Sequence, residues 1–169
     1  MRTSASAILV AALATAVAAP PAASARTYDV TRAVARVLPS VAAGTDVPVR
    51  LPARLALDYD GTVSADASTS RARYAIHLGA VPGCGTASAC NLATFSGRRG
   101  GRLPMAARVT LARGIEAAYT PSRCGASCSP ASIRWLQRGV LYAITAKVPG
   151  SPRATLVRAA NSSAGRRAR

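Results

Sequence analysis

Four cysteines form two close pairs in this 169-residue sequence, Cys84 with Cys90 and Cys124 with Cys128. Closely spaced thiols can form disulfide bonds, hold a zinc ion or exchange electrons. The first pair is spaced more widely than in a usual four-cysteine zinc site, and neither pair has the C-x-x-C spacing of a redox-active motif. We expect one disulfide within each pair, because each pair lies in a segment rich in Gly, Ser and Pro. Bridges between the two segments and a zinc site are the alternatives.

Two aspartates in the segment Leu55–Val63 form a second candidate site. The segment resembles the first motif of the haloacid dehalogenase family of phosphohydrolases, in which hydrophobic residues precede D-x-D-G-T. The resemblance implies a doubly wound parallel sheet and a magnesium ion. It also implies that Asp58 is the nucleophile and a metal ligand, that Asp60 is the general acid/base, and that Lys147 is the phosphate-binding lysine.

Few carboxylates are available to complete such a site, because Asp66 and Glu116 are the only acidic residues after Asp60. A magnesium ion beside a phosphate is held by several carboxylates. We therefore favour a turn at Asp60-Gly61 within a β-hairpin. A weak calcium loop is a further reading, and a phosphohydrolase that uses Asp58 and Asp60 is the alternative function.

His77 is the only histidine, so a Ser-His-Asp triad or a Cys-His pair would have to use it. It alternates with Tyr74, Ile76 and Leu78, which predicts that it lies on the solvent side of a strand or faces a second layer. The chain carries no G-x-S-x-G, H-E-x-x-H or G-x-x-x-x-G-K motif. We predict no catalytic residue, no metal ligand and no cofactor.

The N-terminus has the pattern of a Sec-type secretory signal peptide. Arg2 precedes an apolar run, Ala7–Ala19, that is too short to span a bilayer, and the small residues Ala23-Ser24-Ala25 predict cleavage after Ala25. This indicates a secreted or extracytoplasmic protein, in a compartment where disulfides persist. We expect a signal peptide at 1–25, a single domain at 26–164 and a basic disordered tail at 165–169.

The charge is strongly positive, because 22 Lys and Arg oppose 6 Asp and Glu, which gives a net charge of +16. Arg98, Arg99 and Arg102 cluster in a glycine-rich turn and are the candidate ligand-binding residues for phosphate or carboxylate groups. A nucleic acid is the usual partner of so basic a protein. Export and an aromatic content of 4% argue against that partner, because few rings are available for stacking.

Helices are expected at both ends of the domain. Asp29 can cap a first helix whose apolar residues recur at helical spacing until Pro39 ends it. Ser151 and Pro152 give an N-cap and a proline at the first position of a C-terminal helix.

Between them the apolar period changes to two, with Trp135 and Tyr142 as a core aromatic pair in the hairpin Ile133–Val148. The polar segment Ser64–Ser70 is interpreted as a turn. Besides the strand around Ile76, strands are expected at Leu55–Tyr59, Asn91–Phe95, Arg108–Ala112, Ile115–Tyr119, Ile133–Leu136 and Val140–Val148. The pattern predicts an α+β fold: an antiparallel meandering β-sheet with the N-terminal and C-terminal helices packed on one face, stapled by disulfides.

Residues 74–161 are similar to small exported actinobacterial proteins of unknown function. The similarity rests on the strand around Ile76, the two cysteine pairs, the hairpin with Trp135, Gly139, Leu141 and Tyr142, and the closing helix. It implies an envelope module of sheet and helix, with no catalytic residue to transfer. We therefore expect a secreted non-enzymatic domain that associates with an anionic cell-wall polymer or a membrane surface, and the oligomeric state stays open.

Overall fold

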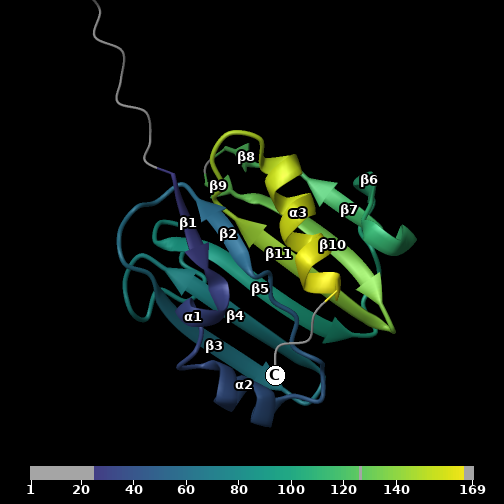
Figure 1. The fold of residues 1–169 in the computed structure, drawn as a ribbon, viewed down its shortest axis with the longest axis horizontal. Helices are drawn as coiled ribbons and strands as arrows, with labels where there is room; N and C mark the ends of the chain where they lie inside the picture. Colours follow the sequence, from purple (N-terminus) through teal and green to yellow (C-terminus); the bar gives the residue numbers. More distant parts are fainter. Residues whose placement is uncertain (1–24, 126, 166–169) are drawn as a thin grey trace, which may run out of the picture.

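A seven-stranded antiparallel sheet forms the centre of the fold in the computed structural model, which describes residues 25–125 and 127–165 (Figure 1). Across the sheet the strand order is β3-β4-β5-β11-β10-β7-β6. Two meanders, β3-β4-β5 and β6-β7-β10-β11, are joined where β5 pairs with β11. The strands are β3 (Ser64–Ser70), β4 (Arg73–Gly79), β5 (Asn91–Arg99), β6 (Ala107–Thr110), β7 (Glu116–Thr120), β10 (Ala131–Gln137) and β11 (Val140–Ala146).

All the regular helices lie on one face of this sheet, together with a ribbon of two strands (Figure 1). The ribbon pairs β1 (Arg26–Asp29) with β2 (Arg54–Leu57), and a second small ribbon pairs β8 (Arg123–Cys124) with β9 (Cys128–Ser129). The helices are α1 (Val30–Ala33), α2 (Leu38–Gly44) and α3 (Pro152–Gly165), and η1 (Ala112–Gly114) is a single 3-10 turn. The predicted α+β fold is confirmed. Among the described residues, no helix has the length and apolarity to cross a membrane.

The hydrophobic core lies between the sheet and this layer of helices. Alternate residues of β4, Tyr74, Ile76 and Leu78, point into it and are almost completely buried, as the alternation predicts. Trp135 lies directly opposite Tyr142 in the β10–β11 register, and their rings stack with centroids 5.4 Å apart. This confirms the predicted aromatic pair.

The N-terminal helix begins as predicted but ends earlier. The backbone N–H of Arg32 donates to Asp29 Oδ1 at 3.0 Å, so Asp29 is the N-cap. However, α1 ends at Ala33, and Pro39 lies in the first turn of α2 instead of ending the helix. A proline is tolerated in a first turn because the N–H that it lacks has no intrahelical partner there. At the other end, α3 includes Gly165, which was assigned to the tail.

Two turn predictions in the middle of the chain are wrong. Asp60-Gly61 does not close a hairpin, because β2 pairs with β1 while β3 pairs with β4, so the segment 58–63 connects two different sheets. The polar segment Ser64–Ser70 is the edge strand β3 rather than a turn. An edge strand with mostly exposed side chains needs no apolar alternation, which is why the pattern concealed it.

The expected glycine-rich turn at 97–101 begins later than predicted, since β5 continues to Arg99. Gly97 is a strand residue whose missing side chain makes room for two rings. A Cβ there would lie 2.5 Å from Tyr74 Cε1 and 3.1 Å from Tyr142 Cε1. The chain turns at Gly100, which has a φ of 68°.

Candidate functional site

The face of the large sheet opposite α3, called the helix-free face below, carries small and polar side chains. One row crosses six strands in register. The row consists of Asp66, His77, Thr94, Thr145, Ser132 and Thr120. Because alternate residues of a strand point to opposite faces, the residues that build the core on one side leave this polar row on the other.

A cavity of about 440 Å³, called the arginine cavity below, lies on the helix-free face. Arg98 reaches it from β5, Arg134 from β10 and Arg102 from the connection between β5 and β6. Ser96, Ala143 and Thr145 contribute to its lining from the central strands. Because these side chains are small, they leave space above the sheet, and the three arginines surround this space.

The connection 100–106 forms one wall of the arginine cavity because it lies on the sheet at Leu141. A Cβ on Gly101 would be 2.5 Å from Leu141 Cβ, so only glycine permits this close approach. Arg102 and Pro104 follow and line the cavity. The path takes the chain from β5, in the middle of the sheet, to β6 at its edge.

The charged residues that line the arginine cavity are all positive. None of its lining residues is acidic. Within 25–125 and 127–165 a single salt bridge occurs, Arg71 to Asp46 at 3.5 Å, and it does not involve the cavity. The charges of the three arginines are therefore not neutralised by a carboxylate of the described chain, and the recess has a positive potential.

The predicted trio of ligand-binding arginines is thus divided. Arg98 and Arg102 share the cavity, but Arg99 points elsewhere and donates from Nη2 to the backbone oxygen of Asp46 at 3.0 Å. The sequence-based prediction missed Arg134. Its alternation with the core residues Ile133 and Trp135 places it on the helix-free face, but its proximity to Arg98 depends on the long-range pairing of β11 with β5.

A second recess of about 240 Å³, called the hydroxyl cavity below, adjoins the first and shares Thr145 with it. Asn91 and Thr94 line it from β5. Its walls come from two disulfide-closed segments: Thr86 and Ser88 precede Cys90, and Ser129 follows Cys128. No residue that lines it is charged.

Both disulfides have the favoured local connectivity, Cys84 to Cys90 and Cys124 to Cys128. All four cysteines are therefore used, and the alternatives of a zinc site and of bridges between the segments are wrong. The two disulfides suggest an oxidising, extracytoplasmic environment. The expected signal peptide cannot be compared with the fold, because residues 1–24 lie outside the described residues, as does the basic tail beyond Gly165.

His77 positions Asn91, which in turn holds the first disulfide segment against the sheet. Its Nδ1 lies 3.0 Å from Thr94 Oγ1 and accepts from Asn91 Nδ2 at 3.3 Å, while Asn91 Nδ2 also donates to the carbonyl of Gly85. Burial lowers the pKa of His77, and the charge of Asp66 partly opposes this effect. The imidazole is neutral at pH 7, which leaves Nδ1 able to accept.

Lys147 also holds this segment, because its Nζ donates to the carbonyls of Ser88 at 2.7 Å and Ala89 at 3.1 Å. Lys147 directly follows β11 and lies beside the hydroxyl cavity. Its observed side-chain partners are therefore backbone oxygens.

The two aspartates of the phosphohydrolase-like segment have exposed side chains in the connection after β2. Asp58 donates its backbone N–H to the Lys147 carbonyl at 3.0 Å, and the Asp60 carbonyl accepts from Arg26 at 3.3 Å. The strand before them belongs to an antiparallel ribbon, so the doubly wound parallel sheet that the resemblance implied is not the fold of this chain. Across the described residues, no group of three or more His, Cys, Asp or Glu could hold a metal ion.

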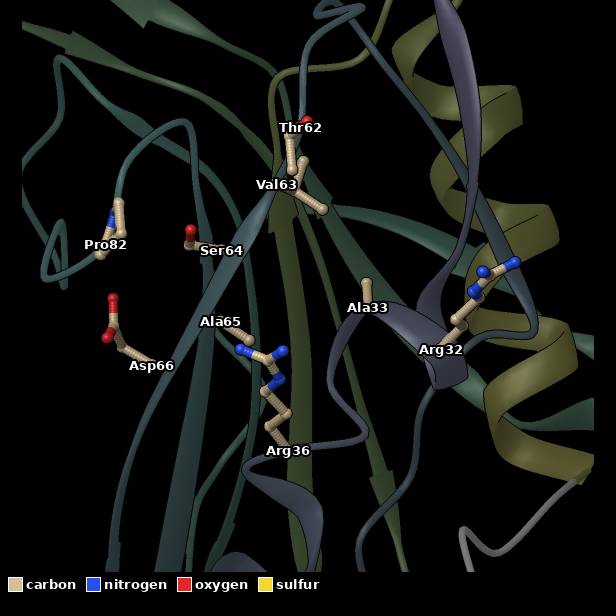
Figure 2. A pocket seen from close by; sticks show the side chains of 9 residues that line it. All are labelled: Arg32, Ala33, Arg36, Thr62, Val63, Ser64, Ala65, Asp66 and Pro82. Carbon is tan, nitrogen blue, oxygen red and sulfur yellow. The ribbon is translucent and has the colours of Figure 1, made fainter.

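A larger recess of about 470 Å³ follows the edge strand β3 (Figure 2). Ser64 and Asp66 point to one side of the strand, and Arg36 lies on the other (Figure 2). The recess therefore wraps around the sheet edge, and the strand separates its arginines from its carboxylate. Asp66 Oδ2 is buried and has no hydrogen-bond partner in the described part of the chain.

Comparison with known proteins identifies no relative: no protein-family model, no curated protein and no solved structure matches the chain. The similarity to small exported proteins therefore stays a prediction, and the two cavities of the helix-free face are the candidate functional site.

Proposed function

We propose that the protein is a secreted, non-enzymatic domain that binds an anionic polymer of the cell envelope through the arginine cavity. The observation that carries the proposal is the convergence of Arg98, Arg102 and Arg134 on one recess without a carboxylate. A guanidinium group forms paired hydrogen bonds to phosphate or carboxylate oxygens, so three of them favour a ligand with several acidic groups.

The shape of the site favours a polymer chain over a membrane surface. The connection 100–106 packs on the sheet and forms one wall of a recess, which admits a chain more readily than a flat layer of headgroups. A nucleic acid is a weaker candidate, because Phe95, Trp135 and Tyr142 are buried in the core and offer no stacking surface.

Binding to anionic polymers at increasing salt tests this proposal. We expect the purified protein to bind isolated cell walls at low ionic strength, and its affinity to fall about tenfold or more between 50 and 500 mM NaCl, because binding releases counterions. Failure to bind walls, or binding that does not respond to salt, would contradict the proposal. Tighter binding to anionic lipid vesicles than to walls would replace the polymer by a membrane.

A matched pair of triple variants separates the cavity from general charge. R98Q/R102Q/R134Q removes three charges from the arginine cavity, whereas R54Q/R153Q/R158Q removes three exposed charges from the side that bears α3. We expect only the first variant to lose wall binding. Equal losses would show that net charge alone causes adhesion. Magnesium-dependent hydrolysis of a phosphate ester that D58N abolishes would instead establish the alternative function, a phosphohydrolase using Asp58 and Asp60.

A further inference from the structure

We infer that the polymer is an anionic polysaccharide, with an acidic group in the arginine cavity and a neutral sugar unit in the hydroxyl cavity. The inference rests on the proposed function and adds the chemical class of the ligand. Its basis is that two recesses of different chemistry adjoin at Thr145, which lines both of them. A ligand that follows the helix-free face past Thr145 meets guanidinium groups on one side and hydroxyl groups on the other.

The lining of the hydroxyl cavity matches sugar hydroxyls in hydrogen-bonding capacity. Thr86, Ser88, Ser129 and Thr145 offer hydroxyl groups that both donate and accept. A sugar hydroxyl also does both, whereas a phosphate or carboxylate only accepts. No charged side chain lines the cavity, and the nearby Lys147 ammonium already donates to two carbonyls, so an acidic group gains little there that would offset its loss of hydration. A bare polyphosphate would therefore use the arginine cavity alone.

The spacing along β5 indicates how long the ligand is. Thr94 lines the hydroxyl cavity and Arg98 the arginine cavity, four residues apart on one strand. At about 3.3 Å per residue this is roughly 13 Å. One monosaccharide is too small to reach both cavities, whereas consecutive units of an oligosaccharide can occupy them together.

The walls of the hydroxyl cavity are held in place before any ligand binds. The disulfide between Cys84 and Cys90 closes one wall, and Lys147 donates to two carbonyls of the same segment. The disulfide between Cys124 and Cys128 closes the ribbon opposite. A wall that is already ordered costs little conformational entropy on binding, so weak hydrogen bonds to sugar hydroxyls suffice to select a ligand.

Titration calorimetry with four probes tests the inference: a hexasaccharide of alternating glucuronic acid and N-acetylglucosamine, a phosphorylated mannan oligosaccharide, linear polyphosphate and monomeric glucuronate. We expect the protein to bind at least one of the two anionic oligosaccharides about tenfold or more tightly than polyphosphate, and the monomer too weakly to measure. If neither oligosaccharide exceeds polyphosphate while polyphosphate binds, the inference is wrong and the proposed function stands. If none of the anions binds, the proposed function itself fails.

Two variants locate the sugar unit. S88A/S129A removes two hydroxyls that line the hydroxyl cavity but not the arginine cavity and keeps every charge, and S68A/S70A makes the same changes outside both cavities. We expect the first variant to weaken oligosaccharide binding about tenfold and to leave polyphosphate binding within about twofold. The second should change neither. Equal oligosaccharide affinities for S88A/S129A and the unmodified protein, with matching melting temperatures, would overturn the inference.

Discussion

The two faces of the seven-stranded sheet differ in the side chains that they carry, although the same strands build both. On β10, Ile133 and Trp135 are almost completely buried against the helices, whereas Arg134, between them, lines the arginine cavity on the helix-free face. On β11, Tyr142 and Ile144 lie in the core, and Ala143 contributes to the floor of the cavity. Large residues on one face exclude water and stabilise the fold, while small ones on the other leave space for a ligand.

The faces also differ in the hydrogen-bond partners of their arginines. Arg50 is 8% exposed and lies on the side that bears α3. Its Nη1 donates to the carbonyls of Ser163 at 3.2 Å and Ala164 at 2.8 Å, and its guanidinium lies over the Tyr142 ring at 5.5 Å. It therefore satisfies the carbonyls at the end of α3. The cavity arginines have no such acceptor among the contacts of the described chain, which leaves them available to a ligand.

The largest effect on stability is expected from W135A, on the face of the sheet that packs against the helices, called the covered face below. Trp135 is 1% exposed and stacks on Tyr142, so its truncation leaves a large cavity in the core. We expect the free energy of unfolding to fall by about 3–5 kcal/mol, measured by urea denaturation. A loss below about 1 kcal/mol would mean that the covered face does not carry the stability that the comparison assigns to it.

A smaller loss is expected from R50M, which keeps much of the aliphatic length of the side chain and removes the charge. The Ser163 carbonyl loses its Arg50 donor and the Ala164 carbonyl keeps only the longer bond from Gln137, so we expect the free energy of unfolding to decrease by about 2–3 kcal/mol. R54M, at an exposed position on β2, is the control and should change stability by no more than about 0.5 kcal/mol. Similar losses in the two variants would argue against a structural role specific to Arg50.

Much of the covered face could be predicted from the sequence because its signals are local. The alternation around Ile76, the Trp135–Tyr142 pair and the Asp29 cap each involve residues within one strand, one hairpin or one helix turn. The short local disulfides were favoured for the same reason. On the helix-bearing side, the apolar spacing predicted one helix up to Pro39, whereas α1 ends after four residues and a separate helix, α2, begins at Leu38.

The helix-free face could be predicted only in part, because long-range register assembles it. Arg98 and Arg102 are close in sequence and were expected together, whereas Arg134 joins them through β11, which pairs with both β5 and β10. Arg99 does not line the cavity, because β5 continues to Arg99 and its side chain donates to the Asp46 carbonyl. The hydroxyl cavity was not anticipated, since its walls come from two segments far apart in sequence that carry no joint signal.

Removal of the disulfide between Cys84 and Cys90 tests whether the wall of the hydroxyl cavity contributes to the stability of the fold. We expect C84S/C90S to lose about 2 kcal/mol of unfolding free energy, the loop-entropy contribution of a short bridge. Because Lys147 and Asn91 still hold the segment, its position should survive and the loss should stay near that value. A much larger loss, measured by urea denaturation against C124S/C128S, would show that the wall of the hydroxyl cavity is part of the folding core.

A pH titration of stability tests the role of His77. Its pKa in the folded protein is lowered by burial, so the unfolded chain binds a proton more readily. The stabilisation from neutral His77 is therefore complete above its ordinary pKa of about 6.5 and is lost as the pH falls below it. H77Q, which cannot titrate, should show a shallower decline in unfolding free energy between pH 7.5 and 5. Parallel pH profiles for the two proteins would contradict this account.

The smallest effect on stability is expected from R98Q/R102Q/R134Q, although this variant should abolish polymer binding. The three side chains lie around one cavity without a carboxylate, so their mutual repulsion slightly opposes folding. We expect a melting temperature equal to or slightly above that of the unmodified protein at 20 mM NaCl, with the difference disappearing at 500 mM because salt screens the repulsion. A marked decrease in melting temperature at either salt concentration would show that these arginines support the fold. In that case the two faces would not divide stability from binding, and lost binding by the variant could not be attributed to the cavity.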